Sequence, residues 1–472
     1  MDKDIVDFAL ECARGKKVEY AEVRALSQVQ DGVMLRNGVV EAYVSAVDSG
    51  FCVRVIADGG IGFASTNKWT KGEAEAIVNM AHKYAKSAKR KDKLVFSEKK
   101  GVKTKWTVEQ KKKIQNVSPE ERISTLAEVN KALVSSKVKI PATMTSCQIN
   151  LITKYFVNSE GSSISSFVPK IGAFMFITVA EQGKMEQAYN QFGYSGGWEA
   201  FTTWKMPEKM VHTAKVLKDV ITKAKTVKPG NMDLVCGPEV AGIAAHESCG
   251  HPMEADRILG REMSQAGRSF IYKGGPFWIG KKIGSKAVTV VDDPTVAHSY
   301  GYYEYDDEGV KARRRFLYKE GLINEFLQNR ESAAKMGVES NGSSRSTNYD
   351  REAIVRMANT FVLPGEMTED ELIKDVKYGV FMKSFTEWNI DDKRFNQRYV
   401  GREAYLIEKG ELTSPIARPV IETTTQKFWT AVDAVSKKVE YEAATCGKGD
   451  PSQGIPVYTG GPCLRLKEVY VK

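Results

Sequence analysis

A hexapeptide with two histidines, HESCGH at residues 246–251, places the strongest local constraint on the fold of this chain. Residues 235–243 before it are typical of a strand followed by a turn, with Pro238 in the first turn of a helix. On an ideal helix, two side chains five positions apart point about 140° from each other, so both histidines can reach one metal ion only where the helix widens or ends. A π-type bulge or a break at Gly250 would allow this, and Pro252 marks the same point as a helix breaker. The hexapeptide therefore predicts a distorted helix inside a domain.

The same hexapeptide has the residue types of a metal site. His-Glu-x-x-x-His is one residue longer than the zincin motif, in which two histidines bind zinc and the glutamate acts as a base. A catalytic zinc takes three protein ligands and leaves a fourth position open. His246 and His251 would supply two of them, and two ordinary, partly buried histidines are the alternative. The candidates for the third ligand are Cys249, Glu254, Asp256, His298 and Cys446, of which the residues alone leave Cys249, Glu254 and Cys446 level. Cys446 stands in a glycine-rich stretch that we expect to turn.

The composition indicates a folded protein of two or three domains. Its 472 residues are 42% hydrophobic, which is enough for large cores and excludes global disorder. No apolar run reaches the roughly 18 residues of a membrane span, and the N-terminal segment lacks the apolar core of a signal peptide. The seven cysteines are dispersed and odd in number, which is typical of reduced thiols rather than of a disulfide framework. We therefore expect a cytoplasmic protein with no membrane partner.

Most of the net charge of +10 is concentrated in one segment. Residues 89–113 hold eleven Lys or Arg and three Asp or Glu, a net charge of +8. Such a run is typical of a solvated linker, and a nucleic-acid-binding segment is the rival interpretation. Trp106 and Phe96 are the large rings in the run, which is little base-stacking chemistry. The sequence therefore does not predict a nucleic-acid partner.

The pattern of predicted elements divides the chain into four parts and indicates an α+β fold. An N-terminal α+β domain is expected over residues 1–90, followed by a basic linker at 91–115. A middle α+β region is expected over 116–228, where a Lys-Pro-Gly triplet marks its end. The remainder, 229–472, reads as the largest domain, rich in β-strands and containing the hexapeptide.

The first domain shows clear helix and hairpin signals. Two amphipathic helices are predicted, the second begun by Thr70 with Glu73 in a capping box. Two hairpins between them should turn at Asn37-Gly38 and Asp58-Gly59. The predicted buried faces comprise Ile5, Phe8, Ala9 and Cys12 in the first helix, and Ile77, Met80, Ala81 and Tyr84 in the second.

Several polar and aromatic residues of the C-terminal part invite more than one interpretation. An acidic pair at residues 292–293 and an acidic triplet at 306–308 stand beside Pro or Gly, so we interpret them as turn residues rather than as a second metal site. The four tyrosines between 300 and 305 recur at strand spacing, which favours packing on a sheet or a groove wall, with a peptide-binding edge strand as an alternative. The weak candidates for stabilising an oxyanion are His298, Tyr300 and Arg313–Arg315, for each of which an ordinary structural role is the alternative.

The segment HESCGHPMEAD, residues 246–256, resembles the signature of the TldD/PmbA family, in its TldD-type metallopeptidase branch. The resemblance continues in similar order through the C-terminal part and extends to the N-terminal blocks, so it covers most of the chain. Its further segments are VVDDPT (290–295), DDEGV (306–310), MANTFVLPG (357–365), YGVF (378–381), EAYLIEKG (403–410) and TCGKGDPSQGIPVYTGGPCLRL (445–466). The most specific elements are the hexapeptide and the Cys-Gly-Lys near the C-terminus.

The resemblance implies a function and a set of site residues. His246 and His251 correspond to the family's zinc-binding histidines, Glu247 to its catalytic glutamate, and Cys446 to its cysteine ligand, whereas the pattern does not require Cys249. It implies one Zn²⁺ per chain in a C-terminal metallopeptidase domain, with Glu247 activating a zinc-bound water to hydrolyse unfolded or small peptides. It also implies a homodimer or a heterodimer with a PmbA-type subunit. A non-catalytic, peptide-binding subunit of such a complex is the alternative.

Overall fold

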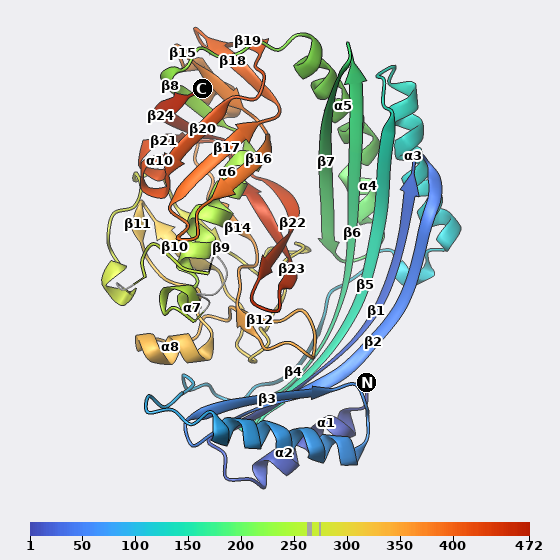
Figure 1. Cartoon of the computed structure of the whole chain (residues 1–472), viewed down its shortest axis with the longest axis vertical. Helices are drawn as coiled ribbons and strands as arrows, with labels where there is room; N and C mark the ends of the chain where they lie inside the picture. Colours follow the sequence, from blue (N-terminus) through green and yellow to red (C-terminus); the bar gives the residue numbers. More distant parts are fainter. Residues whose placement is uncertain (262–266, 273–274) are drawn as a thin grey trace.

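A computed structural model describes residues 1–261, 267–272 and 275–472 of the chain (Figure 1). A long, curved sheet forms one side of the molecule, and a larger domain lies on its concave side. Helices and sheets are segregated rather than alternating, which confirms the predicted α+β class.

The curved sheet combines strands from the N-terminal and middle parts of the chain. Its seven strands follow the order β3-β2-β1-β5-β6-β4, and β7 also pairs with β6. All neighbours are antiparallel except β4, which runs parallel to β6. The strands are β1 (Tyr20–Arg36), β2 (Val39–Ala57), β3 (Gly60–Thr66), β4 (Lys103–Thr107), β5 (Ala142–Asn158), β6 (Ser163–Glu181) and β7 (Lys184–Ser195).

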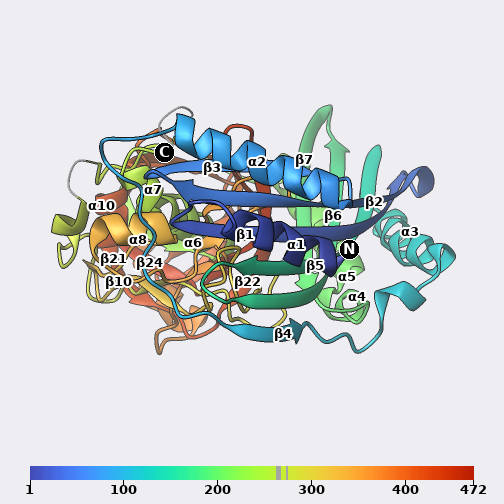
Figure 2. The same cartoon turned by 90° about the horizontal axis from the view of Figure 1, so that it is seen from below.

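Helices cover one face of this sheet and leave the other face to the C-terminal domain (Figures 1 and 2). Alternate side chains of a strand point to opposite faces, and on β1 the odd-numbered residues are the apolar ones that pack under the helices. Two helices pack at one end of the sheet and three at the other. They are α1 (Lys3–Arg14), α2 (Lys71–Ser87), α3 (Pro119–Ser135), α4 (Ala200–Trp204) and α5 (Met206–Thr222). A short 3₁₀ turn, Ile114–Asn116, precedes α3.

The predicted turns and helix start in the N-terminal domain are confirmed. Asn37 and Asp58, each followed by Gly, have φ of 49° and 53°, as type I′ hairpin turns require. The Thr70 side chain accepts a hydrogen bond from the backbone N–H of Glu73, so it caps α2.

The buried face of α2 differs from the predicted one. Met80 and Tyr84 are 45% and 49% exposed, although Ile77 and Ala81 are buried as predicted. The physical reason is the close approach of α2 to β3, where a Cβ atom added to Gly62 would lie 1.9 Å from the carbonyl oxygen of Ala81. Only small side chains fit at that distance, so the helix turns Ala81 toward the strand and leaves Met80 and Tyr84 on its outer side.

The basic segment 91–115 contributes β4 to the edge of the sheet. Its side chains alternate, with Lys103 and Lys105 exposed and Trp106 only 9% exposed. Leu94, Phe96 and Ile114 in the same segment are also buried. The ring of Trp106 packs against Tyr302 at 6.2 Å between centroids rather than facing solvent.

The C-terminal domain is built on a nine-stranded sheet in the order β16-β17-β20-β24-β8-β15-β18-β19, with β21 paired to β24. Its strands are β8 (Gly230–Cys236), β15 (Tyr378–Met382), β16 (Phe385–Ile390), β17 (Asn396–Gly401), β18 (Ala404–Glu408), β19 (Glu411–Pro415), β20 (Val420–Thr424), β21 (Val432–Val435) and β24 (Leu464–Val471). The helices are α6 (Pro238–Ala245), α7 (Ala255–Ile258), α8 (Arg330–Met336), α9 (Glu369–Lys374) and α10 (Thr425–Ala431), with a 3₁₀ turn at Gly275–Trp278.

Smaller sheets complete this domain and connect it to the curved sheet. A four-stranded sheet contains β9 (Val290–Asp292), β10 (Arg315–Lys319), β11 (Leu322–Ile323) and β14 (Thr360–Val362), and a two-stranded one β12 (Ser344–Arg345) and β13 (Ile354–Val355). The hairpin of β22 (Glu440–Lys448) and β23 (Gln453–Gly461) lies between the domain and the curved sheet (Figure 1). Within the described residues, no helix is both long enough and apolar enough to cross a membrane.

Candidate metal centre

The histidine hexapeptide continues a buried helix and widens it. The strand β8 leads through Gly237 into α6, Pro238–Ala245, with proline at the first helical position. Over His246–Gly250 the helix is a π-helix, and His251–Met253 form a 3₁₀ turn. The two imidazole rings consequently lie 4.9 Å apart between centroids, nearly perpendicular at 84°. The widening predicted from the five-residue spacing is confirmed.

Cys446 completes a cluster of three donor side chains. One nitrogen of each histidine and the Sγ of Cys446 lie within 4.8 Å of one another. The Sγ is 3.5 Å from Nε2 of His251, although the two residues are 195 positions apart in sequence. All three side chains are at most 5% exposed. Cys446 lies within β22 rather than in the expected turn, so the hairpin delivers the thiol to the end of α6.

Glu254 lies beside the cluster but outside it. Its Oε2 accepts a hydrogen bond from Nδ1 of His251 at 2.9 Å, which leaves Nε2 of that ring facing Cys446. The same carboxylate is held by Arg257 at 2.5 Å and by Lys448 at 3.4 Å. This is the carboxylate–histidine arrangement that fixes the tautomer and orientation of metal-binding imidazoles. The structure therefore gives Glu254, one of the three level candidates, an orienting position.

Lys448 fixes the hairpin to the helical motif. It lies two positions after Cys446 on β22, so both side chains point to the same side of the strand. Its Nζ contacts Asp256 at 2.7 Å and donates to the carbonyl oxygen of Val355 at 2.7 Å. The Cys-Gly-Lys spacing thus supplies a thiol and, on the same face, the cation that compensates the acidic residues after His251.

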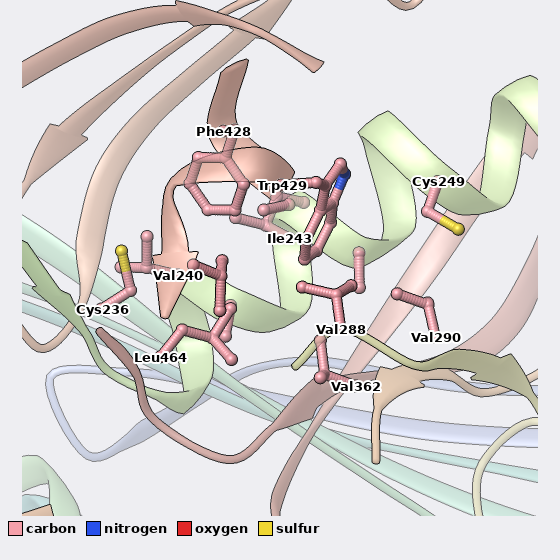
Figure 3. Close-up of a cluster of buried hydrophobic side chains, with 14 of the residues drawn as sticks. Cys236, Val240, Ile243, Cys249, Val288, Val290, Val362, Phe428, Trp429 and Leu464 are labelled. Carbon is pink, nitrogen blue, oxygen red and sulfur yellow. The ribbon is translucent and has the colours of Figure 1, made fainter. Parts of the chain in front are cut away.

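Cys249 belongs to the hydrophobic core instead of the cluster. Figure 3 shows its sulfur beside Val290 in the packed interior, on the helix that also carries Ile243. It is 0% exposed, and burial raises the pKa of its thiol well above the usual value. The neighbouring Ser248 is held by the indole of Trp429, which donates to its Oγ at 3.1 Å. Among the described residues, Cys249 is not one of the donor groups that lie within 4.8 Å of one another.

Glu247 is buried and paired with an arginine that the sequence pattern did not indicate. Its Oε2 accepts a hydrogen bond from Arg394 at 2.7 Å, in the loop between β16 and β17. Burial raises the pKa of Glu247 above the usual carboxyl value, and the nearby His246 and Arg394 offset part of that rise. Arg394 has a positive φ of 61° and stands in a polar loop with no motif, so nothing in its surroundings could have singled it out.

The electrostatics of the cluster suit a soft divalent metal. Burial alone would raise the pKa of Cys446, but His251 and the Arg356 guanidinium outweigh it and lower the pKa to about 7. Burial lowers the pKa of both histidines, which favours neutral imidazoles. The Nδ1 of His246 is buried with no hydrogen-bond partner in the described structure. Two neutral imidazoles and a thiolate form a donor set that zinc commonly binds in proteins.

The other candidate residues have structural roles in the described parts of the chain. His298 stacks on Tyr194 with centroids 5.0 Å apart and bonds to the carbonyl oxygen of Ser195. The guanidinium of Arg315 forms a fully buried ion pair with Asp292. Asp306 accepts hydrogen bonds from the backbone N–H groups of residues 308 and 310, as the turn interpretation predicts.

Comparison with family models covers nearly the whole chain. A model described as the PmbA/TldA metallopeptidase C-terminal domain matches residues 229–472, which is more than half of the chain. The chain belongs to the PmbA/TldD family. The models of domain 1 and of the central domain match residues 21–88 and 112–226. The family resemblance inferred from the sequence is therefore confirmed, and the chain is a member of a metallopeptidase family.

Relatives in the PmbA/TldD family carry metalloprotease names. A metalloprotease of Methanocaldococcus jannaschii is 29% identical, over 95% of this chain and 96% of its own length. A protein named zinc metalloprotease TldD homolog from Saccharolobus solfataricus is 27% identical, over 91% of each chain. Among solved structures, TldE from Thermococcus kodakarensis has a TM-score of 0.77 at 16% identity, covering 99% of each chain, which shows the same fold.

Proposed function

We propose that the protein is a zinc-dependent metallopeptidase that hydrolyses peptide bonds in unfolded or small peptides. Its catalytic domain would span residues 229–472. The observation that carries the proposal is the cluster of His246, His251 and Cys446, three buried donor groups within 4.8 Å, next to the buried carboxylate of Glu247. The metalloprotease names of the relatives support the same conclusion.

In this proposal His246, His251 and Cys446 hold one Zn²⁺ per chain. When bound, the metal would act as a Lewis acid that polarises the substrate carbonyl. Glu247 accepts a proton from the attacking water and passes it to the leaving amine. A pKa raised by burial suits both steps, because a base and its conjugate acid exchange protons best near the working pH. Arg394 holds the Glu247 carboxylate through their ion pair.

The burial of the site supports unfolded or small peptides as substrates. His246, Glu247 and His251 are 3% to 4% exposed, so the surface of a folded protein cannot reach them. A single extended strand is the form of polypeptide that fits a narrow path and can bind through its backbone.

We further propose a cytoplasmic, two-subunit enzyme, either a homodimer or a heterodimer with a PmbA-type partner. The free thiols and the absence of a membrane-spanning helix among the described residues are compatible with that location. The TldE-type fold of a structural neighbour makes a related partner chain a reasonable hypothesis.

Two substitutions test the proposal, with zinc content and peptide hydrolysis as separate measurements. Glu247→Ala should keep its zinc and lose hydrolysis, because it removes the base but no ligand. Cys446→Ser should lose zinc and hydrolysis together. Cys249→Ser is the matched control, with the same substitution in the same domain, and should keep both. If Glu247→Ala hydrolyses peptides normally, or if Cys249→Ser loses the metal while Cys446→Ser keeps it, the proposal is wrong. A zinc-loaded wild type with no peptidase activity would indicate the non-catalytic, peptide-binding subunit instead.

A further inference from the structure

A large cavity lies between the concave face of the curved sheet and the C-terminal domain. Its volume is about 880 Å³, in the range of cavities that hold a ligand much larger than a simple ion. Alternate side chains of β1, β5 and β6 form one wall, and the four tyrosines between residues 300 and 305 contribute to the opposite side. The expectation that these tyrosines pack along a groove wall is thereby confirmed.

The cavity is distinct from the candidate metal centre. Thr445 and Pro456, which face each other across the β22–β23 hairpin, line it, whereas His246, His251 and Cys446 do not. Thr445 and Cys446 are consecutive on β22, so their side chains point to opposite faces of the hairpin. The side chain of Cys446 therefore joins the donor cluster from one face of β22, and that of Thr445 lines the cavity from the other.

In the described part of the chain, three buried cations line this cavity without a direct ion pair of their own, although the carboxylates of Asp306 and Asp307 line it too. Arg24, Lys170 and Arg345 are 3%, 6% and 8% exposed, and among the described residues none forms an ion pair. The Nε and Nη1 of Arg24 have no hydrogen-bond partner in the described structure. Lys170 donates to the hydroxyl of Ser195 at 2.8 Å and to the carbonyl oxygen of Tyr300.

Arg345 is likewise satisfied only by neutral groups. It donates to the carbonyl oxygens of Met357 at 2.7 Å and of Pro456 at 3.1 Å, and it lies over the ring of Tyr303 at 5.1 Å. Other cations of the cavity wall are paired in the ordinary way, as in the ion pair of Lys154 with Asp307 at 2.7 Å.

Lys170 is the least compensated of the three cations: at Arg24 burial acts against the charge, but its neighbours, Asp307 and Glu22 among them, outweigh burial and raise the pKa. Moving a charge out of water is unfavourable unless an opposite charge replaces the lost solvation. Burial lowers the pKa of Lys170 well below its usual value, and the nearby Arg345 and Lys154 lower it further. Bound anions would reduce this cost, because one would restore the charged form of Lys170 and another would satisfy the free N–H groups of Arg24.

We propose that this cavity binds carboxylate groups of an acidic peptide, one near Lys170 and Arg345 and another near Arg24. The inference deepens the proposed peptidase function by naming a substrate class. The same wall carries neutral amide side chains that can bond to a peptide backbone, Gln28, Gln30, Gln148 and Asn150. A cavity of this size, lined by amides, tyrosine rings and cations, fits a peptide segment better than a single inorganic ion.

Binding is measured with the full chain carrying Glu247→Ala, so that the probe is not consumed. The probe is a short fluorescein-labelled peptide rich in glutamate, followed by fluorescence anisotropy, with a lysine-rich peptide of equal length as the negative probe. The glutamate peptide should bind and the lysine peptide should not. Adding Lys170→Met should weaken binding at least about tenfold, because it removes a charge-assisted contact. Arg24→Met is the second variant and should act in the same direction if Lys170→Met fails to fold.

Lys105→Met is the matched control, because it removes an exposed lysine of β4 on the same sheet, outside the cavity. It should change the affinity less than about twofold. Equal losses in Lys105→Met and Lys170→Met, or equal binding of the two probes, would overturn the inference. Competition experiments distinguish a peptide carboxylate from a free anion. Citrate should compete with the peptide only weakly, and inorganic phosphate hardly at all. Phosphate binding as tight as that of the peptide would show a free-anion site instead.

The two proposals fail in different ways. Hydrolysis of an uncharged peptide by the wild type tests the peptidase alone and should be unaffected by Lys105→Met. For a glutamate-rich substrate, Lys170→Met should raise KM. If the protein binds the glutamate peptide selectively but hydrolyses no peptide, the peptidase proposal is refuted and the anion site stands. If it hydrolyses peptides normally but shows no such selectivity, the anion site is refuted and the peptidase proposal stands.

Discussion

Replacing Gly250 with alanine should destabilise the C-terminal domain, although alanine normally stabilises a helix. An added Cβ would lie 1.9 Å from Sδ of Met357, against an ordinary contact distance of 3.4 Å or more, and within 3.3 Å of two further atoms of the same side chain. Met357 is fully buried and cannot swing into solvent. Overpacking of this kind costs about 1–3 kcal/mol, against about 1 kcal/mol gained from helix propensity. A contact of 1.9 Å puts the cost at the upper end of that range, so we expect a net loss near 2 kcal/mol, or roughly 4–8 °C in Tm for a domain of this size.

Differential scanning calorimetry of four variants tests this reasoning. Gly250→Ala combined with Met357→Ala should be no less stable than Met357→Ala alone, because the new methyl group fills part of the space left by the methionine. Gly72→Ala in α2 is the matched control, since a Cβ there meets nothing within 4 Å, and it should leave Tm unchanged or slightly raised. A neutral or stabilising Gly250→Ala, or strictly additive losses in the double variant, would refute the claim that the π-helix is packed against Met357.

Three further substitutions test the charge network. Glu254→Gln should weaken zinc binding about 10–100-fold by loosening His251, measured by competition with a chromophoric chelator; an unchanged affinity would deny Glu254 its orienting role. Arg54 bridges two buried carboxylates, Glu22 on β1 and Glu308 in the C-terminal domain. Arg54→Met should therefore lower the free energy of unfolding by about 3–5 kcal/mol in urea titrations. A loss below about 1 kcal/mol would contradict this. Burial and the nearby Glu239 raise the pKa of Glu442 from 4.5 to about 7. The folded state therefore binds this proton more tightly than the unfolded state, and the stability falls as the pH rises from about 4.5 through 7. Glu442→Gln should therefore gain stability over the wild type across that interval, and parallel pH profiles of Tm would refute the shift.

Local chemistry made the helical motif predictable from the sequence. The five-residue spacing of His246 and His251, with Gly250 between them and a proline after, required a widened or broken helix, and the structure has a π-helix there. Turn residues with positive φ and the cap at Thr70 were similarly readable, because each depends on residues within a few positions.

Features that depend on packing between distant segments were not predictable from spacing. Cys446 reaches His251 only because β22 runs past the end of α6, so the residues left it level with Cys249 and Glu254, and only the family resemblance favoured it. The pairing of Glu247 with Arg394 was equally unpredictable, because the arginine lies in the loop between β16 and β17, far from Glu247 in sequence. The strand β4 was hidden within a lysine-rich run, because its exposed face carries the charges that indicate a linker.

The central claim is that His246, His251 and Cys446 hold one zinc ion for peptide hydrolysis, and metal analysis of the purified full-length protein tests it most directly. Inductively coupled plasma mass spectrometry should measure the zinc content of the wild type, Cys446→Ser and Cys249→Ser, all purified in the same way. We predict one zinc per chain in the wild type and in Cys249→Ser, and none in Cys446→Ser. A wild type that binds no zinc even when zinc is supplied, or a Cys446→Ser variant that retains it fully, would contradict the account.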